Sequence, residues 1–101
     1  MVNKRQLLET VIETEAKTLA GIIHSYVLRM GLASESEAST IANEILSDVV
    51  VTALERAESY DPARRAIPWL LGIALNFIRR RRQAQQRNRE IPVRDLHDNP
   101  E

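Results

Sequence analysis

Apolar residues recur at helical spacing in three stretches of this chain, and no long stretch alternates as a β-strand does. Residues three and four positions apart share one face of a helix, so each stretch predicts an amphipathic helix. Hydrophobic residues make up 44% of the chain but only four residues are aromatic, which favours an aliphatic core between packed helices. We therefore predict an all-α fold, a compact bundle of three main helices.

Glycine and serine indicate where the first two helices end and begin. The first pattern spans about Asn3 to Met30, and Gly31 is the expected stop because glycine accepts a left-handed conformation without a Cβ penalty. Gly21 lies inside this pattern, so a break of the first helix there is an alternative. Ser34 and Glu37 have the spacing of a capping box and predict the start of the second helix.

Proline indicates the end of the second helix and the start of the third. The second helix should stop before Tyr60, because the Asp61-Pro62 pair disfavours helical backbone before the proline. Pro68 suits the first position of the third helix, where its missing N–H group costs nothing. This third helix should reach about Arg89.

A chain of 101 residues has room for one domain. We predict a helical domain over residues 1–90, followed at 91–101 by a tail or the start of an interdomain linker. The chain contains no cysteine, and its first residues lack the apolar region of a signal peptide. Its longest apolar stretch, around Trp69 to Phe77, is far too short to cross a bilayer. These features predict a cytoplasmic protein with no membrane partner.

Acidic and basic residues are segregated along the chain although the formal net charge is zero. Before Arg64, ten acidic residues stand against five basic ones, whereas from Arg64 onward nine arginines stand against four acidic residues. Such asymmetry is common in proteins that have one basic and one anionic partner. The alternative is that the two halves simply attract each other in the folded chain.

Four consecutive arginines, residues 79–82, follow the apolar run of the predicted third helix. The planar guanidinium group matches phosphate oxygens, so arginines held on a rigid helix favour contact with nucleic acid. The alternative is a solvated helix end whose cations complement the helix dipole. The candidate surface is the helix face that carries Gly72, Asn76, Arg79, Arg80, Gln83 and Arg87.

Three residues near this surface each have two interpretations. Asn76 lies in an apolar run, where an unpaired amide is costly, so it either bonds within the fold or faces out toward a base or sugar. Trp69 is at a helical spacing that more often packs in a core than serves as a stacking platform. Tyr60 fits the two roles equally well.

A stripe of acidic residues runs down one side of the predicted second helix. Glu44, Asp48, Val51 and Glu55 follow one another at helical spacing. Such a stripe can meet a basic partner helix while its valine buries a little apolar area. Taken alone, it also fits a merely solvated face.

The sequence offers little for catalysis. His24 and His97 are far apart, and no HExxH, GxSxG or P-loop motif accompanies them. Glu44 and Asp48 are spaced to share a metal ion, but no histidine or third acid lies nearby, so a metal site is not expected. We predict no enzyme activity, no catalytic residue and no cofactor.

Two segments, in this order, resemble region 2 of the sigma-70 family of bacterial transcription initiation factors, particularly its extracytoplasmic-function group. ANEILSDVVVTALERA, from Ala42, is similar to the acidic amphipathic helix of that family. YDP followed by PWLLGIALNFIRRRR is similar to the family's FDP and the helix after it. The resemblance covers roughly Glu15 to Glu90. It implies a transcription initiation factor domain that binds core RNA polymerase and promoter DNA.

The resemblance also implies roles for particular residues. In the family, the acidic helix docks on the clamp helices of the largest RNA polymerase subunit, and the loop and third helix capture the single-stranded minus-ten promoter element, with a flipped base in a loop pocket. The candidate polymerase contacts are Glu44, Ser47 and Asp48, beside Val51 and Glu55 of the same stripe. The candidate DNA contacts are Tyr60, Asp61, Arg64, Arg65, Trp69, Asn76, Arg79 and Arg80, with Gln83 and Arg87 from the helix pattern.

Two alternatives belong to other classes of protein. A protein-interaction module of the same fold, held by an anti-sigma factor, would leave the arginines solvated and need no DNA. A regulator that places the basic helix in a major groove would prefer duplex DNA over a single strand.

Overall fold

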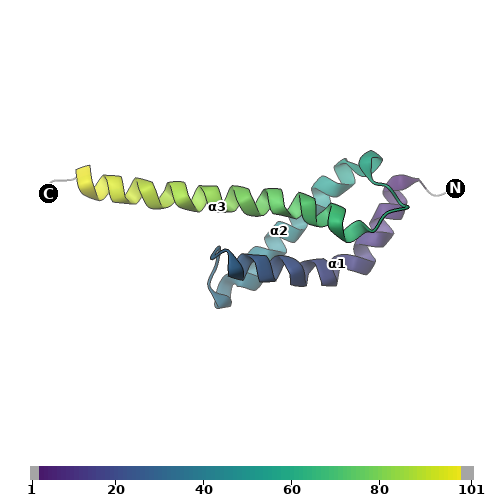
Figure 1. Ribbon diagram of the computed structural model, residues 1–101, viewed down its shortest axis with the longest axis horizontal. Coiled ribbons are helices and arrows are strands. Elements are labelled where there is room, and N and C mark those ends of the chain that lie inside the picture. The colour runs from purple at the N-terminus through teal and green to yellow at the C-terminus, as the bar shows by residue number, and fades with distance from the viewer. Residues whose placement is uncertain (1–2, 99–101) are drawn as a thin grey trace.

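The computed structural model describes the backbone of residues 3–98 and the side chains of residues 3–88. This part of the chain forms three α-helices and one short 3-10 helix, with no strand among residues 3–98. The elements are α1 (Lys4–Arg29), α2 (Glu35–Glu55), η1 (Ala57–Ser59) and α3 (Ala66–Asp98) (Figure 1). The predicted all-α fold with three main helices is therefore confirmed.

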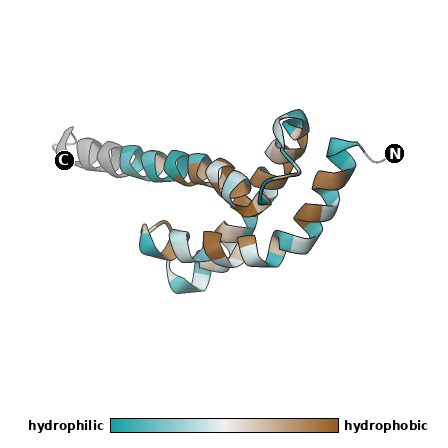
Figure 2. Cartoon of the chain, turned by 45° about the vertical axis from the view of Figure 1, so that its right-hand side comes forward, coloured by the Kyte–Doolittle hydropathy of each residue, from teal (hydrophilic) through white to brown (hydrophobic). Residues whose placement is uncertain are grey.

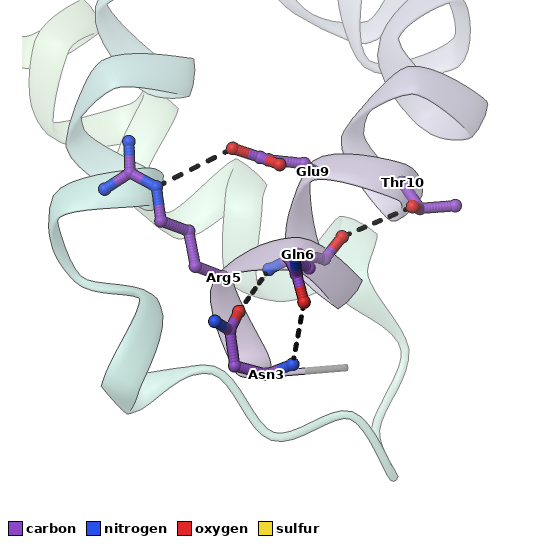
Figure 3. Close-up of polar contacts among 5 residues, drawn as sticks. All are labelled: Asn3, Arg5, Gln6, Glu9 and Thr10. Atoms are coloured by element: carbon purple, nitrogen blue, oxygen red, sulfur yellow. Dashed lines mark hydrogen bonds and ion pairs between the residues drawn. The ribbon is translucent and has the colours of Figure 1, made fainter. Parts of the chain in front are cut away.

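A reciprocal capping box begins α1. The side chain of Asn3 accepts the backbone N–H of Gln6 at 2.8 Å, and the side chain of Gln6 accepts the backbone N–H of Asn3 at 3.1 Å (Figure 3). Two N–H groups at the helix start, which lack partners within the helix, are thereby satisfied. The sequence pattern predicted this helix start but did not identify its capping box.

The first helix is continuous through Gly21, so the alternative of a break there is wrong. A Cβ at Gly21 would meet no atom within 4 Å, so no close helix contact depends on this glycine either. Instead, α1 bends between its purple N-terminal turns and its blue C-terminal turns (Figure 1). The hydroxyls of Thr10 and Thr14 donate to carbonyls four residues earlier, an arrangement that often bends helices.

Gly31 ends α1 as predicted. It has a φ of +67°, a conformation that residues with a Cβ seldom adopt. Its N–H donates to the carbonyl of Leu28 at 3.1 Å, and the N–H of Leu32 donates to the carbonyl of Val27 at 3.0 Å. This pair of bonds is a Schellman motif, and the accompanying apolar contact is provided by the buried side chains of Leu32 and Val27.

The second helix begins where the sequence predicted it, but without the predicted capping box. Ser34 is the N-cap residue, yet its hydroxyl is hydrogen-bonded to the hydroxyl of Ser36 at 3.0 Å and caps no backbone N–H. The hydroxyl of Ser36 thus engages the hydroxyl of Ser34, which a capping box requires as the acceptor of a backbone N–H. The carboxylates of Glu35 and Glu37 instead lie in the first turn, where negative charge complements the helix dipole.

The third helix is longer than predicted at both ends. It begins at Ala66, so Pro68 occupies the third helical position, which is still within the first turn where backbone N–H groups have no partner in the helix. It continues past Arg89 to Asp98, and the predicted end at Arg89 is wrong. Residues 82–90 are mostly Arg, Gln, Ala and Glu, which favour helix, so nothing there stops it. Residues 99–101 of the predicted tail lie outside the described residues.

The core lies where the three helices approach one another, and it is aliphatic as predicted. Figure 2 shows apolar segments in this region, in contrast with the hydrophilic middle part of α3. The largest fully buried side chains come from all three helices: Leu8, Leu19, Ile23, Val27, Ile45, Val49, Leu70 and Ile78. Burial of aliphatic side chains therefore holds the first half of α3 rigidly against α1 and α2.

A polar contact between α3 and the connection of α1 to α2 marks where α3 leaves the body of the protein. The side-chain amide of Gln85 donates to the backbone carbonyl of Leu32, in the connection between α1 and α2, at 2.7 Å. Past this region α3 extends away from the other helices (Figure 1). The arginine-rich part of α3 is thus supported by packing over its first turns and by Gln85 farther along.

Candidate functional site

The connection between α2 and α3 is a tight turn built by Asp61 and Pro62. The N–H of Arg64 donates to the carbonyl of Asp61 at 3.0 Å, and the carboxylate of Asp61 accepts the N–H of Ala63 at 3.0 Å. Proline at the second position of such a turn has the required φ, and aspartate at the first bonds the backbone two residues on. This turn holds Arg64 and the following Arg65 at the N-terminal end of α3.

Tyr60 and Trp69 pack against each other beside this turn. Their ring centroids are 5.5 Å apart with the ring planes tilted by 43°. Tyr60 is only 4% exposed and belongs to the core, which decides between its two interpretations. Trp69 is half-buried, so it contributes to the core and also reaches the surface.

An open hollow of about 730 Å³ lies at this turn. Five of the residues predicted to contact DNA line it: Tyr60, Asp61, Arg64, Arg65 and Trp69. Sequence reasoning missed three further lining residues, Ser59, Ala63 and Pro68. Their only signal in the sequence is their position, with Ser59 just before the predicted residues and Ala63 and Pro68 between them. The hollow therefore gathers aromatic, cationic and hydroxyl groups around one open space.

The predicted face of α3 is exposed along its length. A helix turns by about 100° per residue, which places Pro68, Trp69 and Gly72 on the same side as the polar residues that follow them. Gly72 is exposed, and a Cβ there would meet no atom within 4 Å, so the surface is open at this point. The exposed polar residues beyond it are Asn76, Arg79, Arg80, Gln83 and Arg87.

The exposure of Asn76 decides between its two interpretations in favour of the outward-facing one. The hollow and the exposed face of α3 together form a surface that we call the basic track. It consists of the hollow with Arg64, Arg65 and Trp69, and of Asn76, Arg79, Arg80, Gln83 and Arg87 on α3. From Trp69 to Arg87 the track follows α3 for about 27 Å.

The four consecutive arginines of α3 do not share one environment. Arg80 lies with its guanidinium carbon 5.3 Å from the centroid of the Phe77 ring, a cation–π arrangement that steadies an exposed arginine. Arg81 lies on another side of the helix and pairs with Glu44 of α2, with 3.0 Å between guanidinium nitrogen and carboxylate oxygen. Its side chain is only 34% exposed. Arg81 therefore ties α3 to α2 and is not part of the basic track.

The predicted acidic stripe of α2 is exposed at every position. It consists of Glu44, Asp48, Val51 and Glu55, and the candidate polymerase contact Ser47 beside it is exposed as well. Val51 is 57% exposed, an unusual position for a branched apolar side chain. Within the described residues, the Glu44–Arg81 pair is the one ion pair between α2 and α3. Direct pairing between the acidic and the basic half of the chain is therefore limited to this contact among those residues.

Neither a metal centre nor a membrane-spanning helix is found in the described part of the chain. Residues 3–88, whose side chains are described, contain no group of three His, Cys, Asp or Glu side chains placed to hold a metal ion. Their helices also lack the long apolar segment that a bilayer crossing requires. The exposed charged surfaces and the hollow are therefore the features on which a functional argument can be built.

Comparison with protein-family models, with curated proteins and with solved structures finds no match to this chain. The functional argument therefore depends on the geometry of the hollow, the basic track and the acidic stripe.

Proposed function

We propose that this chain acts as a sigma region 2-like domain in transcription initiation. In this proposal the basic track binds the single-stranded minus-ten element of a promoter, and the acidic stripe binds the clamp helices of the largest subunit of RNA polymerase. The observation that carries the proposal is the open hollow at the start of α3, which leads into a row of exposed arginines on the same side of that helix.

The track has the two kinds of group that hold a single strand. Trp69 offers an aromatic surface at the hollow, and stacking of a base on an aromatic side chain is worth about 1–3 kcal/mol. The arginines of the track bind phosphates with a planar fork of donors, whatever the base sequence. Because the first half of α3 is packed in the core, these cations are held in a fixed row.

The acidic stripe suits a basic protein helix. Its carboxylates are exposed, and Val51 lies among them as an apolar contact that a partner can cover. Electrostatic complementarity of this kind steers association and fixes the orientation of the partner. The stripe and the track lie on different helices, so one partner need not displace the other.

The DNA half of the proposal is tested by fluorescence anisotropy with a labelled single strand at several salt concentrations. Each phosphate contact should contribute about 0.7 to the slope of log affinity against log salt, so contact by three or more arginines gives a slope of about −2 or steeper. The matched control is the same sequence as a duplex, which should bind more weakly. A slope near zero would reject DNA binding, and a preference for duplex would favour a major-groove regulator.

The polymerase half is tested with Asp48→Lys. Asp48 is the better choice than Glu44, because Glu44 also pairs with Arg81 and its reversal would disturb the packing of α3. Binding to a purified clamp-helix fragment should weaken about tenfold, as expected when one charge pair becomes repulsive. Glu13→Lys, an exposed reversal on α1, serves as the control and should leave binding unchanged. Equal binding by wild type and Asp48→Lys would count against this use of the stripe.

A second candidate function is a protein-interaction module without DNA binding, held for example by an anti-sigma factor. The exposed Val51 within the acidic stripe favours a protein partner by itself. The salt titration separates the two functions, because this module predicts no salt-dependent affinity for a single strand.

A further inference from the structure

We propose that the hollow selects guanine over the other three bases, with Arg65 as the residue that reads it. This inference rests on the proposed function, because it requires that the basic track holds a single strand and that one base enters the hollow. It concerns the hydrogen-bonding groups that line the hollow.

The one carboxylate that lines the hollow is already engaged within its own turn. One oxygen of Asp61 accepts the N–H of Ala63 at 3.0 Å, and the other lies 3.6 Å from Nε of Arg64. Its charge is therefore partly compensated within the turn, and the guanidinium group of Arg64 is partly used in the same pair. Asp61 is therefore less available to accept from the amino group that adenine or cytosine presents.

Arg65 has no such partner. It lines the hollow, its side chain is exposed, and it forms no ion pair with any residue of the described part of the chain. Its guanidinium group offers several N–H donors in a fixed fork and has no acceptor. Arg65 therefore provides the hollow with a charged group that can act only as a hydrogen-bond donor.

Guanine is the base that fits a planar fork of donors best. It presents O6 and N7 side by side as two acceptors, and a bidentate pair between arginine and these atoms is the commonest specific contact to a base. Adenine and cytosine present an amino donor on the corresponding edge, and thymine presents one oxygen beside a methyl group. The half-buried Trp69 stacks with any base, so it adds affinity with little selection.

The experiment measures the affinity for short single strands of deoxycytidine in which one central position is varied. The position carries guanine, adenine, cytosine, thymine or 7-deazaguanine, which lacks the N7 acceptor. The guanine strand should bind about tenfold more tightly than the other three natural strands, within the range known for one bidentate pair. The 7-deazaguanine strand should lose this advantage.

Two variants separate the reading of the base from the binding of the phosphates. Arg65→Lys keeps the charge but has no planar fork, so it should keep the salt dependence and lose the preference for guanine. Arg64→Lys is the matched control and should keep the preference, because Arg64 is already placed beside Asp61. Retention of the preference by Arg65→Lys would overturn the assignment of the reader.

The remaining outcomes distinguish this inference from the function on which it rests. If all five strands bind equally, with steep salt dependence, selection of guanine is wrong while binding of single strands stands. If adenine binds as well as guanine, stacking alone accounts for the preference and the inference is overturned. If no strand binds in a salt-dependent way, both the inference and the DNA half of the proposed function are wrong.

Discussion

Reversal of charge at both Arg79 and Arg80, as Arg79→Glu with Arg80→Glu, is expected to lower the affinity for a single strand on the order of a hundredfold at near-physiological salt. Both side chains are exposed on the basic track, and neither has a carboxylate partner among the described residues. Loss of two phosphate contacts should also reduce the salt slope by about 1.4. The two new carboxylates add repulsion from the phosphates.

The control for this double variant changes the same amount of charge elsewhere. Lys17→Glu with Arg29→Glu places two reversals at exposed positions of α1. If affinity depended only on the net charge of the protein, the two double variants would weaken binding equally. That result would contradict binding of the strand at the basic track. Circular dichroism of both variants shows whether the helices are intact. Affinity and salt slope are measured by the same anisotropy titration as for the wild type.

Leu70→Ala is expected to lower the free energy of unfolding by about 2–5 kcal/mol. Leu70 is 1% exposed and lies in the first turns of α3, one turn before the buried Ala74. The substitution removes buried apolar atoms and leaves a cavity that the surrounding helices fill only in part. A loss of this size is a large fraction of the total stability of about 5–15 kcal/mol that is typical of a small domain.

The same substitution at Leu7 is the matched control. Leu7 is 38% exposed, so Leu7→Ala removes less buried area and leaves no closed cavity. Its cost should stay below about 1 kcal/mol. Urea denaturation followed by circular dichroism measures both values. Equal losses at the two positions would contradict the burial of the first turns of α3, on which the rigidity of the basic track depends.

The sequence predicted the structure best where the backbone preference of one residue allows a single conformation. Gly31 ends α1 because few other residues adopt its positive φ, and Pro62 places a turn before α3 because its own φ is restricted. The exposure of the acidic stripe also follows from helical periodicity, since the core-facing positions are apolar, whereas the two interpretations of Asn76 were decided by the structure. These features depend on residues close together in the chain.

Local rules were wrong where two neighbouring groups compete. Ser34 has the spacing of a capping box, but its hydroxyl bonds to Ser36 instead. Gly21 could have broken α1, because a glycine inside a helix costs about 1 kcal/mol relative to alanine. Packing of α1 on both sides of Gly21 outweighs that cost. A single residue thus predicts a helix boundary poorly when tertiary contacts favour continuity.

By itself, the sequence determined three amphipathic helices, the place where the first ends, and the separation of acidic from basic residues along the chain, whereas α2 ends at Glu55, earlier than the predicted stop before Tyr60. These properties arise from backbone preferences and helical periodicity, which act over a few residues. Only the tertiary structure decided that Arg81 pairs with Glu44 while Arg79 and Arg80 form no ion pair with any residue that the structure describes, and that Ser59, Ala63 and Pro68 complete a hollow. Contacts between residues far apart in the chain determine which side of α3 meets α2. Such contacts also determine how the turn at Asp61 folds against Trp69, and local backbone preferences do not contain them.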